Sequence, residues 1–127
     1  MNLEYKDLKE SFKNKTPTLK QVREVVIEIR KGKFPDLNIC GTAGSFFKNV
    51  VVSQTKAKEL QAKYPLMITY QVGGAKVKIP LAWILDHVCD FKGKRKGNVG
   101  VYKNQALVLV NYGNATAQEV TDFAQEM

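Results

Sequence analysis

Two segments of the chain show the 3.6-residue spacing of apolar positions that is typical of an amphipathic helix. The first begins at Thr18, and Gln21 follows it at the capping-box distance. Gly32 is expected to end this helix. The second begins at Thr116, where Glu119 repeats the capping-box spacing, and runs to the end of the chain. The apolar positions of the first helix are Leu19, Val22, Val25, Val26 and Ile29.

Between these helices the pattern alternates short helical and β-prone stretches. Helices are predicted at 54–63, before Pro65, and from Pro80 through Val88. The glycine pair Gly73-Gly74 lies between two β-prone runs and predicts a hairpin. The predicted strands are 50–52, 67–72, 75–79, 99–102 and 106–110, the last of them buried on both faces.

Three stretches lack a clear period. Residues 1–15 are interpreted as a lead-in segment, 33–49 as a long ordered loop and 91–97 as a basic loop. The mixture of elements, with one hairpin and no repeated βαβ period, favours an α+β fold. We expect residues 1–127 to form a single domain in which a mixed or antiparallel sheet packs against helices.

Composition adds a charge argument. The chain has 127 residues, a formal net charge of +8 and a pI near 9.5, which favours an anionic ligand without saying which. No apolar run reaches the roughly 18 to 20 residues of a membrane span, and the N-terminus is too polar for an export signal. A cytoplasmic protein without membrane contact is therefore expected. Cys40 and Cys89 are interpreted as reduced structural thiols, one of them buried; with His87 as the only histidine, no metal site is expected.

The segment 41–49, GTAGSFFKN, concentrates groups that can bind an anion. Its glycines allow backbone amides to approach a ligand, and Ser45, Lys48 and Asn49 can supply a proton, a charge and hydrogen bonds. The spacing differs from that of a phosphate-binding loop, and small residues beside aromatics more often serve packing, so a structural turn is the favoured interpretation of these residues alone. A serine hydrolase is not favoured, because GxSxG is absent and His87 has apolar neighbours.

A second group of candidates lies downstream. Lys92, Lys94, Arg95 and Lys96 are the densest basic cluster and fit a phosphate, an RNA backbone or simply a solvated loop. Nucleic acid is not the expected partner, because aromatic residues are not interleaved with these cations. Trp83 is ordinarily a core residue, and Gln105 enters a buried strand where its amide needs partners.

Several motifs together resemble one enzyme family. They are IRKGKFPD at 29–36, GSFFKN at 44–49, WILD at 83–86, FKG at 91–93 and QALVLVNYGNAT at 105–116, in the order and spacing of UDP-N-acetylenolpyruvoylglucosamine reductase, also called UDP-N-acetylmuramate dehydrogenase. The resemblance spans roughly residues 5–126 and covers only the C-terminal, substrate-binding domain of that family. It implies that a flavin-binding domain, absent from this chain, is its partner.

The resemblance implies a reaction. Members of the family use NADPH and FAD to reduce UDP-N-acetylenolpyruvoylglucosamine to UDP-N-acetylmuramate for peptidoglycan synthesis, and hence for cell shape and division. Hydride goes to the β-carbon of the enolpyruvyl group, and the serine that matches Ser45 protonates the α-carbon. A serine can do this only where its alkoxide is stabilised. No cofactor is expected to bind this chain alone, which is expected to be inactive by itself.

The resemblance also assigns substrate ligands by position. They are Lys33, Asn49, Lys92 and Gln105, mainly near the phosphates, whereas residues 94–96 have no counterpart. Departures from the family pattern are Thr42 in place of asparagine, Val50 in place of proline and Leu81-Ala82 in place of small residues. The family's assisting glutamate, in LEPEV, would follow Met127 and is not expected in this chain.

Two other functions remain open on the sequence. The chain fits a stand-alone binding module for nucleotide-sugars or RNA that has the fold without the catalysis. It also fits a structural protein whose basic loop contacts another protein.

Overall fold

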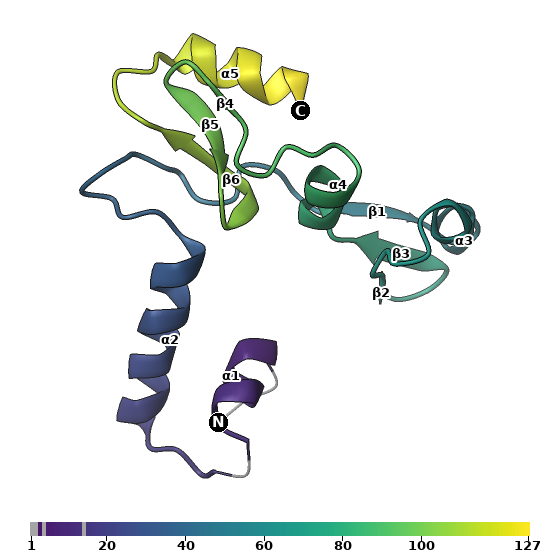
Figure 1. The fold of residues 1–127 in the computed structure, drawn as a ribbon. Helices are drawn as coiled ribbons and strands as arrows, with labels where there is room; N and C mark the ends of the chain where they lie inside the picture. The colour runs from purple at the N-terminus through teal and green to yellow at the C-terminus, as the bar shows by residue number, and fades with distance from the viewer. Residues whose placement is uncertain (1–2, 4, 14) are drawn as a thin grey trace.

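Three groups of elements make up the computed structural model, which describes residues 3, 5–13 and 15–127 (Figure 1). The first group holds a sheet and the C-terminal helix: β4 (Arg95–Lys96), β5 (Val99–Tyr102), β6 (Gln105–Asn111) and α5 (Ala117–Glu126). The second holds a smaller sheet and a helix: β1 (Val50–Ser53), α3 (Gln54–Lys63), β2 (Tyr70–Gln71) and β3 (Lys76–Ile79). The third is the helix pair α1 (Lys6–Ser11) and α2 (Leu19–Lys33), and α4 (Leu81–His87) joins the first two groups. The protein is a small α+β domain, as the pattern predicted, and its strands form two antiparallel sheets where one mixed or antiparallel sheet was expected.

The first sheet, in the order β4-β5-β6, holds the main core. Helix α5 contacts β5 and helix α4 contacts β6. The valines of β5 and β6 are almost completely buried, which is the environment predicted for the apolar run 106–110. The four with the least exposure are Val99, Val101, Val108 and Val110.

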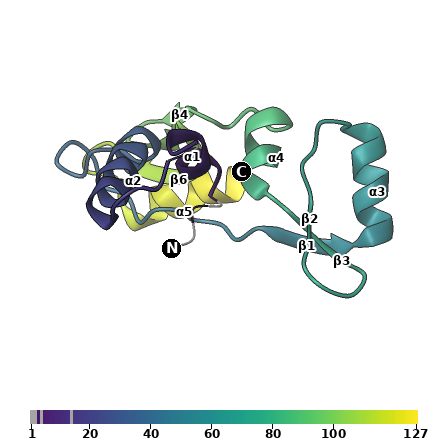
Figure 2. The same ribbon diagram turned by 90° about the horizontal axis from the view of Figure 1, so that it is seen from below.

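The second sheet has the order β1-β3-β2 and contains the predicted hairpin. Tyr70 pairs with Lys78 and Gln71 with Val77. Gly73 and Gly74 both have positive φ, which explains the glycine pair in this turn. The paired part is shorter than predicted, because β2 covers only two residues. Figure 2 shows this sheet and α3 standing apart from the β4-β5-β6 sheet, with α4 between them.

Both predicted capping boxes are confirmed. In α2 the Thr18 hydroxyl accepts from the Gln21 amide, and the Gln21 side chain accepts from the Thr18 amide at 2.8 Å. Thr116 and Glu119 make the reciprocal pair at the start of α5. Each pair occupies backbone donors that lack a partner inside the helix.

Four local predictions are wrong. Gly32 does not end α2, which continues to Lys33 and stops at Phe34 before a proline. Part of the lead-in segment forms the helix α1; residues 1, 2, 4 and 14 lie outside the described part. Within the basic loop, Arg95-Lys96 form an edge strand, because pairing with β5 supplies their partners. Both cysteines are free thiols, and neither is fully buried.

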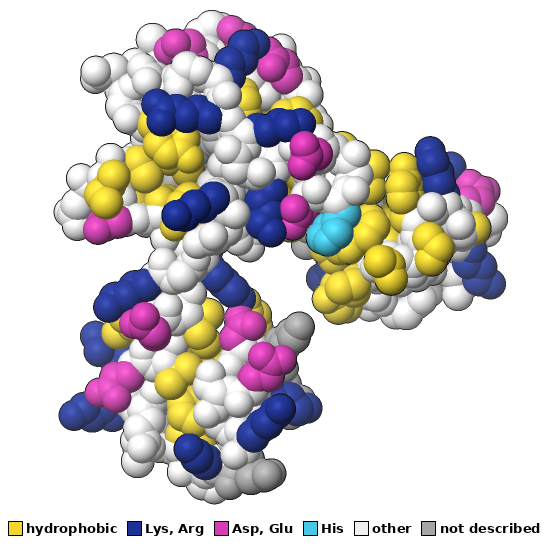
Figure 3. Space-filling model, in the orientation of Figure 1, with side chains coloured by type: hydrophobic (Ala, Val, Ile, Leu, Met, Phe, Trp, Pro, Cys, Tyr) yellow, Lys and Arg dark blue, Asp and Glu magenta, His cyan; other side chains and the backbone are white. Residues whose placement is uncertain are grey.

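The pair α1 and α2 extends away from the rest as an arm (Figure 1). No residue of α2 is buried, and the space-filling view shows its apolar side chains at the surface (Figure 3). Asn104, in the turn between β5 and β6, donates to the carbonyl of Gly32 at 2.7 Å and links the arm to the sheet. None of the described helices is long and apolar enough to cross a membrane.

Candidate functional site

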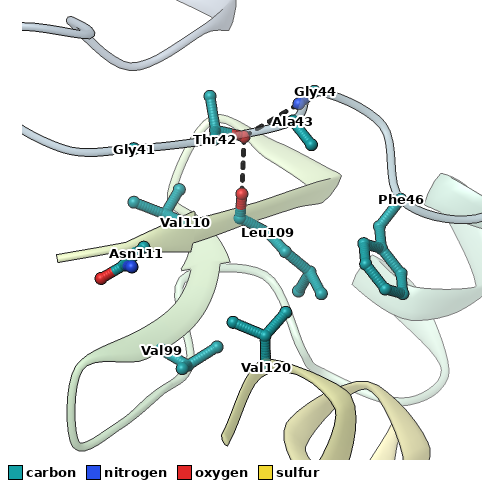
Figure 4. Close-up of a pocket in the computed structure, with 10 residues that line it drawn as sticks. All are labelled: Gly41, Thr42, Ala43, Gly44, Phe46, Val99, Leu109, Val110, Asn111 and Val120. Atoms are coloured by element: carbon teal, nitrogen blue, oxygen red, sulfur yellow. Dashed lines mark hydrogen bonds between the residues drawn. The ribbon is translucent and has the colours of Figure 1, made fainter. Parts of the chain in front are cut away.

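The segment 41–49 lies along the outer edge of β6. Gly41 and Asn111 exchange two backbone hydrogen bonds, of 2.9 and 2.8 Å, and the Phe46 amide donates to the Leu107 carbonyl at 2.9 Å. Between these points the Thr42 hydroxyl donates to the Leu109 carbonyl at 2.6 Å and accepts from the Gly44 amide at 3.0 Å (Figure 4). The predicted loop is therefore ordered by β6, and its shape depends on a strand more than sixty residues away.

Ser45 is an exposed residue of this segment. It forms an isolated bridge with Val108, so its backbone is held against the buried centre of β6 while its side chain is accessible. Within the described residues the Ser45 hydroxyl has no hydrogen-bond partner. A fixed backbone with an unoccupied hydroxyl is what a residue that donates a proton to a ligand requires. The two residues that follow Ser45 differ in burial, because Phe47 packs against the core whereas Phe46 is exposed.

Asn49 ends the segment and connects it to α4. Its side-chain oxygen accepts from the Leu81 amide at 3.0 Å, and so it satisfies one of the free donors at the start of that helix. Pro80 is the N-cap residue and makes no side-chain cap of its own. The predicted substrate ligand Asn49 thus has its oxygen in use for structure, which leaves its NH₂ group for a ligand.

A cavity of ≈ 240 Å³ lies where β6, α4 and the small sheet meet. Two of the predicted substrate ligands, Lys92 and Gln105, line it together, although thirteen positions separate them in the chain. Lys92 donates to Asp86 at 2.8 Å across the cavity wall. The remaining lining residues are Ile68, Tyr70, Pro80, Ala82, Trp83, Asn104 and Ala106.

Three of these lining residues were not identified as ligands from the sequence. Tyr70 is 51% exposed and lines the cavity, and the Lys78 ammonium group lies over its ring, 5.6 Å from the centroid. Trp83 is only partly buried, stacks on His87 at 4.8 Å and also lines the cavity, so its interpretation as a core residue is wrong. Asp86 holds Lys92 in place. The residue types of Tyr70, Trp83 and Asp86 did not indicate a ligand site, because these side chains come together only when the hairpin and α4 pack beside each other.

A second cavity, of ≈ 280 Å³, lies between residues 41–44, β6 and α5 (Figure 4). Phe46, Leu109 and Val120 point toward it, and no lysine or arginine lines it. Both cavities are smaller than the roughly 300–1,000 Å³ of a complete ligand pocket. Each can hold a part of a ligand the size of a nucleotide-sugar.

Lys33, another predicted ligand, lines neither of these two cavities and lies on the arm. At the end of α2 its ammonium group forms an ion pair with Asp7 and donates to the Tyr5 hydroxyl at 2.9 Å. The hydrogen bond to Asp7, assisted by that to Tyr5, raises the pKa of Lys33 above its ordinary value of 10.5. Lys33 is therefore fully charged at neutral pH and held by the arm.

The basic cluster 94–96 is engaged within the domain. Lys96 pairs with Glu126 and Lys94 lies 3.5 Å from Asp90, while the Arg95 guanidinium stacks 4.3 Å above the Tyr112 ring. The two ion pairs neutralise part of the charge that an RNA backbone would need. No group of three or more potential metal ligands occurs among the described residues.

Comparison with known proteins gives a consistent result. The family model described as UDP-N-acetylenolpyruvoylglucosamine reductase, C-terminal domain, matches residues 35–127. The reductase of that name from Porphyromonas gingivalis is 47% identical over 99% of this chain and 38% of its own length. Those from Flavobacterium johnsoniae and Polynucleobacter asymbioticus are 46% and 43% identical over 100% and 97% of this chain. The chain spans little more than a third of the length of these curated relatives, 38% and 36% of the latter two.

Proposed function

The chain belongs to the UDP-N-acetylenolpyruvoylglucosamine reductase family, in its C-terminal domain, and we propose that it binds the UDP-sugar and supplies the proton for the reduction. One observation carries this proposal: Gln105, Lys92 and Ser45 are arranged around a single strand, β6. Gln105 lies at the beginning of β6 and faces the cavity shared with Lys92. Ser45 lies opposite Val108, three residues further along.

The nucleotide part of the substrate is assigned to the cavity between β6, α4 and the small sheet. A diphosphate requires cationic and amide donors, and Lys92 and Gln105 in the cavity lining provide them. Asn49 is not a lining residue, but its side-chain oxygen binds the Leu81 amide, between Pro80 and Ala82 of the lining, so its NH₂ group is a nearby donor. The exposed ring of Tyr70 gives a flat apolar surface beside them. In the empty site the Asp86 carboxylate neutralises Lys92, which donates a hydrogen bond to it. When the substrate binds, Lys92 must leave Asp86 or share its donors between Asp86 and the substrate.

Ser45 is assigned as the proton donor. When a hydride reaches the β-carbon of the enolpyruvyl group, the α-carbon becomes a carbanion stabilised by the neighbouring carboxylate. The Ser45 O–H bond then breaks and an α-carbon–hydrogen bond forms, leaving a serine alkoxide that regains a proton from solvent. General acid catalysis of this kind contributes about 10²- to 10⁴-fold. The exposed Ser45 hydroxyl, which has no hydrogen-bond partner among residues 3, 5–13 and 15–127, supports the assignment.

The hydride source belongs to the part of the enzyme outside this chain. FAD and NADPH are implied by the family, but the cavity beside Ser45 does not fit a flavin dinucleotide, because it is only ≈ 280 Å³ and has no cationic lining residue for a diphosphate. We therefore assign the flavin to a separate domain. On this proposal the chain alone does not turn over, and it acts in the cytoplasm as part of peptidoglycan synthesis.

The binding proposal can be tested on the chain itself. Titration with UDP-N-acetylglucosamine, followed by calorimetry or NMR, is expected to show weak saturable binding that Lys92→Ala weakens at least about tenfold, since a hydrogen bond to a charged group contributes about 1.5–3 kcal/mol. Gln105→Ala should weaken it less. Lys96→Ala is the matched control, because Lys96 pairs with Glu126 away from the cavity.

Two outcomes would contradict the assignment of the cavity. One is an equal loss of affinity in Lys96→Ala and Lys92→Ala with a steep dependence on salt, which indicates unspecific attraction of polyanions. The other is that UDP-N-acetylglucosamine binds neither to the chain alone nor to a fusion of the chain with the preceding two-thirds of the Porphyromonas gingivalis relative. With that joined protein, Ser45→Ala should lower the rate of reduction at least about 100-fold and leave substrate affinity unchanged.

A further inference from the structure

Three carbonyl groups of β6 point to its outer edge, at Leu107, Leu109 and Asn111. The first and the last accept backbone amides, from Phe46 and Gly41. The middle one accepts the side-chain hydroxyl of Thr42 instead. At Leu109, between these two positions, a side-chain hydroxyl has thus replaced a backbone amide as the hydrogen-bond donor.

The pairing register changes at the same place. Gly41 pairs with Asn111 and Ser45 with Val108, so four steps along the segment face three steps along β6. One extra residue is therefore inserted, as in a β-bulge. Gly44, inside this interval, has φ +85°, a conformation that favours glycine. Its amide is held by the same Thr42 hydroxyl.

We propose that Thr42 is a positioning residue, whose hydroxyl maintains this bulge and thereby sets the face on which Ser45 is presented. The functional importance of this role rests on the proposed function of Ser45, whereas the experiment below tests the role of Thr42 independently of that function. Because side chains alternate along a strand, a shift of one residue in pairing turns every following side chain to the opposite face. Without the bulge the register of Gly41 would place Ser45 opposite Leu107 rather than Val108.

The physical reason lies in the two groups that Thr42 joins. Its hydroxyl donates to the Leu109 carbonyl and accepts from the Gly44 amide, and both contacts are partly buried. Thr42→Val keeps the shape of the side chain but leaves both backbone groups without a partner. The Leu109 carbonyl can regain a donor if a backbone amide of the segment 41–46 pairs with it directly. This pairing removes the bulge.

NMR on the 127-residue chain tests this without ligand or activity. Ser45 and Val108 form a closely spaced antiparallel pair, for which a strong Hα–Hα nuclear Overhauser contact is expected. In Thr42→Val this contact should disappear and hydrogen exchange of the Gly44 amide should accelerate at least tenfold. Thr42→Ser keeps a hydroxyl and should preserve both. Ser45→Ala should also preserve both, because the bulge does not depend on the Ser45 side chain.

The proposal is overturned if Thr42→Val keeps the Ser45–Val108 contact and the Gly44 protection, or if Thr42→Ser loses them like the valine variant. Should Thr42→Val not fold, the unmodified chain decides: a slowly exchanging Thr42 hydroxyl proton with contacts to Leu109 supports the inference, and rapid exchange of that proton overturns it. A failure of nucleotide binding would contradict the proposed function and leave these readings unchanged.

Discussion

Helices α2 and α5 begin in the same way and are packed differently. Both start with a capping box, and both have apolar residues on one face. Helix α5 buries Phe123 against the sheet beside Phe91 and Val120, whereas α2 buries no residue in fifteen. The match to the C-terminal domain of the family begins at residue 35, after α2 has ended. An amphipathic pattern therefore predicts a helix without saying whether its apolar face is covered within the same domain.

The largest difference between the two helices should appear on truncating an apolar side chain. Phe123 is 4% exposed, and its ring meets that of Phe91 edge-on at 6.3 Å. Phe123→Ala is expected to lower the free energy of unfolding by about 3–5 kcal/mol, measured by urea denaturation. The matched change in the arm, Ile29→Ala, should cost about 1 kcal/mol or less. A similar loss in both variants would show that the arm and the sheet unfold as one unit.

A pair of glycine substitutions should have opposite signs in the two regions. A Cβ at Gly100 would lie 2.7 Å from the Lys94 carbonyl oxygen and 3.1 Å from the Tyr112 ring, so Gly100→Ala should destabilise the sheet by about 1–3 kcal/mol. A Cβ at Gly32 meets nothing within 4 Å, in a helix. Gly32→Ala should stabilise α2 by about 0.5–1 kcal/mol. Circular dichroism during thermal unfolding measures both, and a stabilising Gly100→Ala would contradict the tight β4–β5 contact.

Removing each cap compares the helices more finely. Thr116→Ala and Thr18→Ala each remove a cap that contributes about 1 kcal/mol. The first should lower the global denaturation midpoint, because α5 is part of the core. The second should only increase hydrogen exchange in the first turn of α2. Equal shifts of the midpoint would contradict this division.

The cap of α5 also depends on pH. Hydrogen bonds from Thr116 lower the pKa of Glu119. A lowered pKa in the folded state means that the stabilisation is present above the ordinary pKa of the carboxyl group and is lost as the pH falls through the lowered value. Protection of the α5 amides should therefore decline only in acid, and Glu119→Gln should remove this dependence. An unchanged pH profile in that variant would contradict the assignment.

The smallest effect concerns Lys33. Because its pKa is raised in the folded state, its ion pair with Asp7 stabilises the arm fully below its ordinary pKa of 10.5 and is lost as the pH rises through the raised value. Both side chains are about a third exposed, 34% and 32%, so the pair should contribute about 0.2–1 kcal/mol. Asp7→Asn should lower the pKa of Lys33, as followed by NMR titration. No change in that pKa would show that Tyr5 alone holds the ammonium group.

The elements that could be predicted from the sequence are those with local causes. Thr18 with Gln21 and Thr116 with Glu119 satisfy helix ends from three residues away. The turn at Gly73-Gly74 follows from positive φ at both glycines. The motifs around Ser45 and Gln105 also indicated the family. Each of these signals lies within a few positions of the feature that it predicts.

Features that depend on contacts distant in sequence were not predicted. Strand β4 exists because Gly100 lets residues 94–95 approach closely, and the cavity beside Lys92 exists because Tyr70 and Trp83 come together from different elements.

The sequence by itself therefore determined the α+β class, the helix starts, the hairpin turn and the family. Only the tertiary structure decided that Lys92 and Gln105 share a cavity, that Lys33 is held by Asp7, and that Thr42 replaces a rung of β6 next to Ser45. The reason is that local spacing specifies backbone conformation, whereas the positions of functional side chains depend on which strands and helices pack against one another.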